Sequence, residues 1–180
     1  MTRAHGNAEF KARCTDTRGA IRRVRAAGAR WAGREHQLDT YYNVVEGRLK
    51  IREMGSRAEL VWYFRGDKLR SKRSEVLMFS LTDPASVKET LGRTLGVKAI
   101  VDKVRRVYLR DNVRVHFDEV RGLGKFVEIE SVGAAKDFPT LRKQAEGMAQ
   151  VLGPRPGDLI RESYSDLVSR TATKPTRGPT

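Results

Sequence analysis

The segment from Val113 to Ser131 constrains the fold more than any other part of the chain, because its side chains alternate strictly on both sides of a glycine turn. Polar residues alternate with valine and phenylalanine before the turn, and glutamates alternate with valine and isoleucine after it. Successive side chains of a strand point to opposite faces, so the pattern predicts a β-hairpin with one apolar and one charged face. Pairing of the two strands gathers Asp118, Glu128 and Glu130 on the charged face, beside His116.

Carboxylates that face one another across strands repel unless a cation lies between them. A divalent metal is one such cation, because it prefers hard oxygen ligands. A charged face that is simply exposed to water is the alternative, and such faces are common on antiparallel sheets. The hairpin alone favours the exposed face, so the choice depends on the other strands.

The overall composition sets limits on the class of protein. The chain has 180 residues, enough for one well-packed domain and short for two. Its formal net charge of +14 predicts a polyanionic partner, which composition leaves open between nucleic acid, an acidic membrane and a phosphate-rich small molecule. The sequence has no run of eighteen apolar residues and no apolar segment near its start, so we expect neither a membrane-spanning stretch nor a signal peptide, and the single Cys14 excludes an internal disulfide. We therefore expect a cytoplasmic protein with a buried thiol.

Period-two and helical patterns divide the rest of the chain into strands and helices. We expect six strands before the hairpin, at 7–14, 31–45, 48–53, 59–65, 72–80 and 98–110, and helices at 16–28, 83–96, 137–152 and 161–168. We expect residues 1–168 to form a single domain and residues 169–180 to be a disordered basic tail.

The distribution of charge over these strands predicts a tunnel. Eight antiparallel strands with few helices indicate one sheet closed into a barrel, of the α+β, mainly β class. Nearly every strand has one apolar face and one face of Arg, Lys or carboxylate. The amphipathic helices need an apolar surface to cover, so we place the apolar face outside and the charged face around a polar lumen. Charges clustered in a lumen are costly unless a ligand neutralises them, and a triphosphate with a divalent metal is suitable.

An ordered set of short motifs resembles the CYTH family, also called triphosphate tunnel metalloenzymes, and within it the class IV adenylate cyclase-like branch. The resemblance covers residues 7–168. Its motifs are Glu9-Phe10-Lys11, Asp39-Thr40-Tyr41-Tyr42, Leu49-Lys50-Ile51-Arg52, Tyr63-Phe64-Arg65, Lys103-Val104-Arg105, the hairpin from Arg114 to Glu130, and Ser163-Tyr164-Ser165-Asp166-Leu167.

This resemblance implies an eight-stranded tunnel that binds a triphosphate together with Mg²⁺ or Mn²⁺. The metal ligands that it implies are Glu9, Asp118, Glu128 and Glu130, with Asn7 as a further candidate. The phosphate-binding residues that it implies are Lys11, Lys50, Arg52, Arg65, Lys103, Arg105 and Arg114. It also implies a catalytic role for Glu9 and Lys11, the latter in orienting or activating an attacking water. Tyr42 and Tyr63 are candidates for contact with a base or sugar.

Two positions depart from the family pattern. Asn7 stands where the family signature begins with Glu, and an amide oxygen can bind Mg²⁺ but brings no charge. Arg65 stands where many relatives carry Lys. Because Arg does not deprotonate in proteins, we expect Arg65 to hold phosphate rather than act as a base.

The sequence leaves the reaction open. The expected substrate is a nucleoside triphosphate such as ATP, or inorganic triphosphate. It would be converted by cyclisation to cyclic AMP and pyrophosphate or by hydrolysis. Alternatives are a catalytically weak or inactive tunnel, which Asn7 suggests, and a basic protein that binds nucleic acid or polyphosphate. The chain has no recognised nucleic-acid motif, which disfavours the last alternative. A homodimer is left open, and no membrane partner is expected.

Overall fold

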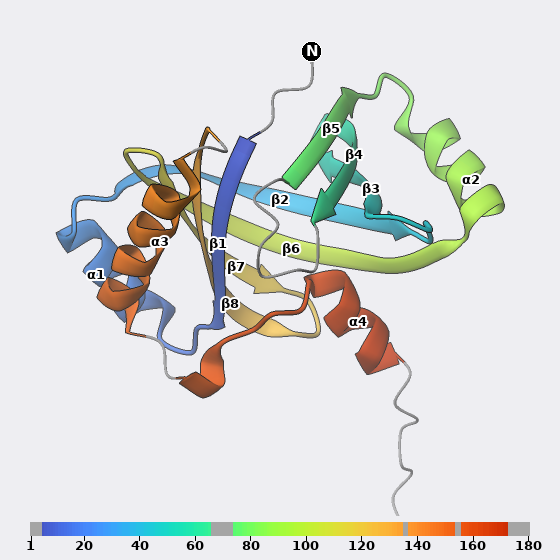
Figure 1. Cartoon of the computed structure of the whole chain (residues 1–180). Coiled ribbons are helices and arrows are strands. Elements are labelled where there is room, and N and C mark those ends of the chain that lie inside the picture. Colours follow the sequence, from blue (N-terminus) through green and yellow to red (C-terminus); the bar gives the residue numbers. More distant parts are fainter. Residues whose placement is uncertain (1–4, 66–73, 135–136, 154–155, 173–180) are drawn as a thin grey trace, which may run out of the picture.

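The computed structural model describes residues 5–65, 74–134, 137–153 and 156–172 (Figure 1). The strands are β1 (His5–Arg13), β2 (Arg30–Tyr42), β3 (Arg48–Met54), β4 (Arg57–Arg65), β5 (Ser74–Ser80), β6 (Val97–Arg110), β7 (Val113–Val120) and β8 (Gly124–Ala134). The helices are α1 (Thr17–Ala26), α2 (Pro84–Leu95), α3 (Phe138–Leu152), a 3-10 turn η2 (Pro156–Asp158) and α4 (Tyr164–Ala172).

The eight strands form one antiparallel barrel in the order β1-β5-β4-β3-β2-β6-β7-β8, which confirms the predicted fold class. β7 and β8 pair as the predicted hairpin, with His116 opposite Glu128 and Arg114 opposite Glu130. The barrel closes between β1 and β5 through one described residue pair, His5 with Ser74. Figure 1 shows β5 diverging from β1 beyond that pair.

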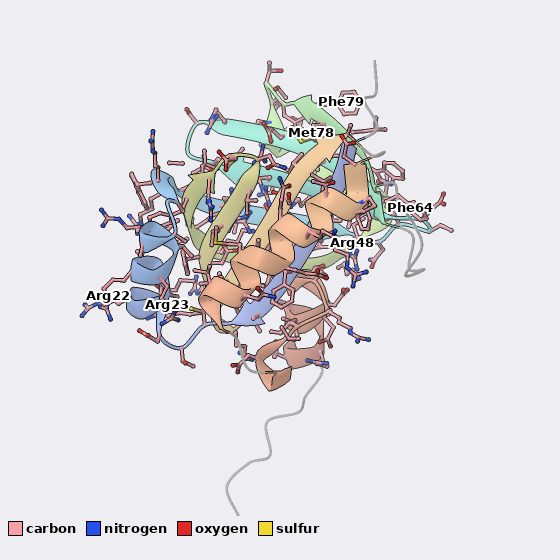
Figure 2. All side chains as sticks on the ribbon, turned by 60° about the vertical axis from the view of Figure 1, so that its left-hand side comes forward. Arg22, Arg23, Arg48, Phe64, Met78 and Phe79 are labelled. Atoms are coloured by element: carbon pink, nitrogen blue, oxygen red, sulfur yellow. The ribbon has the colours of Figure 1, made fainter. Side chains whose placement is uncertain are left out.

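Helices cover the apolar outer surface over one side of the barrel. The main core lies between α1, α3 and the outward side chains of β1, β7 and β8, where Leu141 and Ala145 of α3 pack with Val115 and Ile129. The N-terminus of α1 is capped by Asp16, whose Oδ1 accepts a 2.8 Å hydrogen bond from the Gly19 amide. The exposed Arg22 of α1 projects away from the barrel in Figure 2, whereas Nη2 of Arg23 donates to the Leu152 carbonyl at the end of α3 at 3.3 Å.

The expectation that the helices all cover the outer face is only partly met. α4 packs its Tyr164 and Leu167 against Phe126, Val101 and Tyr41, which point into the barrel, and so closes one end of the lumen. On the opposite side, the outward Leu77 and Phe79 of β5 are exposed. The uncovered outer surface of β5 was not anticipated, because periodicity does not tell which face a helix will cover.

Most predicted elements agree with the structure to within a few residues. β2 ends at Tyr42 rather than at residue 45. α4 extends to Ala172, past the predicted end of the helix at residue 168 and into the segment expected to be a tail. The remaining tail, 173–180, lies outside the described residues. Within the described part of the chain, none of the helices has the length and apolar character needed to span a membrane.

Candidate functional site

The inward faces of the strands and the start of α4 enclose a cavity of about 900 Å³. Seven Lys and Arg side chains and five Glu side chains line it. Ten of them come from strands around the barrel, and Arg161 and Glu162 come from the segment before α4. The lumen is therefore polar and densely charged, as the one-faced charge pattern predicted. The cations lie mainly on β3 and β6, whereas the carboxylates gather on β1 and β8.

Asp39 of β2 organises the cationic side of the cavity. The strand register places it beside Arg52 on β3. Its carboxylate accepts hydrogen bonds of 2.7 Å from both Nε and Nη2 of Arg52 and one of 2.9 Å from Nζ of Lys50, and Nζ of Lys103 lies 4.0 Å away. Burial alone raises the pKa of the Asp39 carboxyl, but Lys50 and Arg52 hold it well below its ordinary value.

The two buried lysines of this group are poised to change charge near neutral pH. Burial lowers the pKa of the Lys50 ammonium to about 8, against the opposing effect of the Asp39 carboxylate. Burial, reinforced by the nearby Arg105 guanidinium, lowers the pKa of Lys103 to about 7. An anionic ligand in the cavity favours the charged form of both, because a nearby opposite charge stabilises the ammonium group.

Arg105 of β6 is the centre of a second ion-pair network, which forms the floor of the cavity. Its Nε and Nη2 donate to the two oxygens of Asp118 at 2.7 and 2.6 Å, and Nη2 also donates to Oε2 of Glu128 at 2.5 Å. The other oxygen of Glu128 lies 3.1 Å from Nζ of Lys11. The Tyr164 hydroxyl donates to Asp118 at 2.9 Å, which attaches α4 to this network.

The acidic wall is formed by β1 and β8. Glu9 is the register partner of Glu130, and the Nδ2 of Asn7 donates to Oε1 of Glu130 at 2.8 Å. The Oδ1 of Asn7 is buried and accepts no hydrogen bond from a described residue. A buried oxygen without a partner is costly, and a cation or water bound beside it would remove that cost.

The acidic wall fits Mg²⁺ or Mn²⁺ in chemistry. Glu9, Glu130 and Oδ1 of Asn7 supply hard oxygens from adjacent strands, and Mg²⁺ is commonly held by one or two carboxylates together with substrate phosphates. No group of three or more His, Cys, Asp or Glu side chains that could hold a metal is found among the described residues.

The structure brings together most of the residues that the sequence suggested. The cavity is lined by Asn7, Glu9, Lys11, Lys50, Arg52, Tyr63, Lys103, Arg105, Glu128 and Glu130. His116 also lines it, with Nδ1 3.8 Å from Oε2 of Glu128, which is beyond hydrogen-bond distance.

Three suggested residues lie elsewhere, and the side chain of a fourth is outside the described residues. Asp118 is buried beneath Arg105, and the cavity lining does not include it. Arg114 lies outside the lining as well, with its Nη1 3.7 Å from Glu130. Tyr42 is buried but faces away from the lumen, because the inward position is taken by Tyr41. Arg65 belongs to β4, and its side chain is outside the described residues.

Sequence reasoning missed several polar residues that contribute to the site, among them Arg161, Glu162 and Ser163 of the segment before α4 and five others. The five others are Asp39, Tyr41, Arg48, Glu59 and Tyr164. Alternation along the strands would have found Arg48 and Glu59, since they share a face with Lys50 and Tyr63 respectively. Tyr164 has no periodic signal, because it reaches the lumen from a helix that closes the barrel end.

Comparison with known proteins agrees with this geometry. Residues 6–164 match the CYTH domain family. The chain is 22% identical over 171 residues to a Methanocaldococcus jannaschii protein named "Putative adenylate cyclase MJ0240", covering 88% of this chain and 96% of the relative.

Solved structures share the fold. The PH1012 protein of Pyrococcus horikoshii OT3 superposes with a TM-score of 0.80 at 24% identity, over 90% of this chain and 99% of that one. A Hippeastrum protein described as a "putative adenylyl cyclase" with a dominant triphosphatase activity superposes with a TM-score of 0.63 at 13% identity, over 96% and 98% of the two chains.

Proposed function

This chain belongs to the CYTH domain family, and from that premise we propose that it is a metal-dependent enzyme acting on a triphosphate-containing substrate. The substrate is a nucleoside triphosphate such as ATP or inorganic triphosphate. The reaction is either cyclisation to cyclic AMP and pyrophosphate or hydrolysis. The archaeal relative named "Putative adenylate cyclase" supports cyclisation, and the Hippeastrum structure described with a dominant triphosphatase activity supports hydrolysis.

One observation carries the proposal: Lys11, Lys50, Arg52, Lys103 and Arg105 converge on a single cavity from three parts of the barrel. So many buried cations repel one another, and their neighbouring carboxylates offset that repulsion only in part. A linear polyanion with oxygens along its length matches them. Arg52 and Arg105 present planar donor groups, and the lysines act as point charges.

The metal belongs at the acidic wall. Glu9 and Glu130 would hold Mg²⁺ or Mn²⁺ with Asn7 and the phosphate oxygens, and Glu128 would contribute if Lys11 moved to the substrate. When bound, the ion polarises a phosphoryl oxygen and offsets the negative charge of the transition state.

The chain's own residues position the substrate between the two walls. Lys11 lies 3.1 Å from Glu128 and 3.8 Å from Glu9, so it stands at the junction of the acidic and cationic sides. From that position Lys11 would contact a phosphate oxygen and orient an attacking water. Positioning and charge neutralisation supply most of the rate in phosphoryl transfer, so no strongly nucleophilic side chain is needed.

The decisive experiment incubates the purified protein with a panel of triphosphates, with Mg²⁺, with Mn²⁺ and with a chelator. Release of orthophosphate identifies hydrolysis, and pyrophosphate with a cyclic nucleotide identifies cyclisation. Glu130→Gln should remove the metal-dependent turnover while the circular dichroism spectrum stays native. Full activity of that variant would contradict the metal assignment.

A tunnel that binds triphosphate without converting it is the second candidate, and Asn7 favours it. The Asn7 amide bonds to Glu130 where the family signature has a third carboxylate, so the metal is held by less negative charge. Tight calorimetric binding of a triphosphate without turnover of any panel member would identify such a protein.

A further inference from the structure

The arginines of residues 17–34 have no role in the cavity. This stretch of α1 and β2 contains six arginines and no lysine, aspartate or glutamate, and the cavity lining includes none of its residues. The lining carries seven basic and five acidic side chains, which account for only two of the fourteen net positive charges of the chain. Most of the excess charge therefore lies outside the lumen, where a triphosphate bound in the cavity does not neutralise it.

Arg34 of β2 and Arg106 of β6 form the centre of an outer basic surface. They are direct register partners. Arg105 points into the lumen, so the next residue, Arg106, and its partner Arg34 face outward. Like charges opposite each other on neighbouring strands repel. Neither arginine has an ion-pair partner among the described residues, and Asp102, which β6 also directs outward, is paired with His36. An anion that lies between Arg34 and Arg106 would remove this repulsion.

Trp31 lies on the same outer face, close to these arginines along β2. It is the register partner of Tyr108, and the two rings pack edge to face with their centres 5.3 Å apart. This contact fixes the indole ring, yet Trp31 is still 54% exposed. A fixed and exposed aromatic ring is a surface on which a nucleic-acid base can stack, and such stacking does not require a particular base.

Helix α1 carries further arginines at this end of the molecule. Arg18, Arg22 and Arg25 are exposed and spaced four and three residues apart, so they form one stripe along the helix. Only three residues separate the end of α1 from Arg30 at the start of β2. In Figure 1, α1, the start of β2 and the turn between β6 and β7 lie together at the left-hand end of the barrel.

The chemistry of this surface matches single-stranded nucleic acid. Arginine presents a planar fork that binds phosphate oxygens with two hydrogen bonds and also stacks on aromatic rings. Proteins that bind single strands without sequence preference combine a basic path for the backbone with aromatic rings that stack on bases, and this mode of binding needs no recognised sequence motif. An anionic membrane fits less well, because interfacial binding needs a continuous apolar face beside the charges, whereas Trp31 is closely flanked by Arg30 and Arg34.

We propose that the outer surface formed by Trp31, Arg34 and Arg106, and extended by the arginine stripe of α1, binds single-stranded nucleic acid. The phosphates of the strand lie along the arginines, and one base stacks on Trp31. The surface lies outside the cavity, so this inference does not depend on the function proposed above.

The test measures the fluorescence anisotropy of a labelled oligouridylate as the salt concentration rises. Binding to wild-type protein should weaken steeply with salt, because each phosphate contact contributes about −0.7 to the slope of log affinity against log salt for a single strand. Arg34→Gln and Arg106→Gln should each make that slope shallower by about 0.7. Arg93→Gln is the matched control, because Arg93 lies exposed on α2 and pairs with Glu89, and it should leave the slope unchanged.

Trp31→Ala tests the stacking contact. Affinity for oligouridylate should fall by roughly 10-fold, within the range for the loss of one base stacked on an aromatic side chain, while the salt slope stays unchanged. The oligonucleotide should quench the intrinsic fluorescence of the wild type. Trp31→Phe leaves Trp62 as the one tryptophan of the chain, so this variant should lose the quenching but keep most of the affinity.

Competition separates this surface from the cavity. Inorganic triphosphate at matched ionic strength should leave oligouridylate binding unchanged, and displacement of the oligonucleotide would place the strand in the lumen and overturn the proposal. Equal losses in Arg34→Gln and Arg93→Gln would show a non-specific effect of charge and overturn it as well. Binding of phosphatidylserine vesicles or of inorganic polyphosphate, without binding of oligouridylate, would identify another polyanion and likewise contradict the proposal.

Discussion

The hydroxyl of Tyr164 lies 2.9 Å from Oδ2 of Asp118, so the C-terminal helix is bonded directly to the floor of the cavity. Asp118 in turn accepts hydrogen bonds from Nε and Nη2 of Arg105, and Nη2 also donates to Glu128. The Tyr164 ring lies beneath two lysines, 4.3 Å from Nζ of Lys11 and 5.2 Å from Nζ of Lys103. The end of the chain is thus part of the site, although it lies far from the other motifs in sequence.

Tyr164→Phe tests this connection. The variant retains the ring under Lys11 but leaves Asp118 with one hydrogen bond fewer in a buried position. The free energy of unfolding should fall by about 1–3 kcal/mol, the cost of a lost hydrogen bond to a charged group, and kcat should fall with it. Urea unfolding and steady-state kinetics measure the two effects. Tyr42→Phe is the matched control, because the buried Tyr42 hydroxyl has no hydrogen-bond partner among the described residues and its removal should cost little. Equal losses in the two variants would show that the Asp118 bond is unimportant.

Loss of the Asp39 charge should lower the free energy of unfolding more than loss of the Tyr164 hydroxyl. Asp39→Asn removes the charge that offsets Lys50, Arg52 and Lys103, and breaking a buried ion pair from one side costs about 3–5 kcal/mol. Thermal and urea unfolding measure the loss. Asp102→Asn is the control, since its partner His36 is mostly exposed, and it should cost no more than about 1 kcal/mol. Similar stability of the two variants would contradict the organising role of Asp39.

The pH dependence of stability in wild type and in Asp39→Asn gives an independent test. Because the pKa of Asp39 is lower in the folded than in the unfolded protein, its stabilising contribution is present above the ordinary aspartate pKa of about 4 and is lost as the pH falls below it. The gap in unfolding free energy between wild type and Asp39→Asn should therefore narrow in acid. A gap that is constant from pH 7 to the acid limit of the native state would refute this assignment.

The sequence predicts the strands and the charged face well, because alternation depends only on local geometry. Alternation also accounts for Tyr42: Tyr41 pairs with the inward Lys50, so the next residue, Tyr42, pairs with Leu49 and faces outward. Alternation does not tell, however, how deeply an inward side chain is buried. Asp118 has an inward position as expected, yet the long side chain of Arg105 on the neighbouring strand covers it. Tyr164 and Asp39 owe their roles to contacts between distant segments, which no local pattern contains.

Ligand binding should be coupled to proton uptake through Lys103 and Lys50. Their pKa values of about 7 and about 8 in the free protein rise when a triphosphate occupies the cavity, so the bound state holds more protons. Affinity should therefore fall as the pH rises through 7 and 8. Calorimetry in buffers of different ionisation enthalpy measures the proton count directly. Lys103→Met should reduce the count, and an unchanged count in that variant would assign the uptake to other groups.

Asn7→Glu restores a carboxylate to the acidic wall and separates metal affinity from catalysis. Without metal, the new charge lies beside Glu9 and Glu130, so the free energy of unfolding should fall by about 1 kcal/mol through like-charge repulsion across the strands. With Mn²⁺, the added hard ligand should tighten binding, so the melting temperature of the variant should rise more steeply with Mn²⁺ concentration than that of wild type. Asn7→Ala removes the buried amide oxygen and should show a weaker response to Mn²⁺ than either. Identical Mn²⁺ responses in the three proteins would place the metal away from β1, whereas the graded order would show that residue 7 contributes an oxygen ligand.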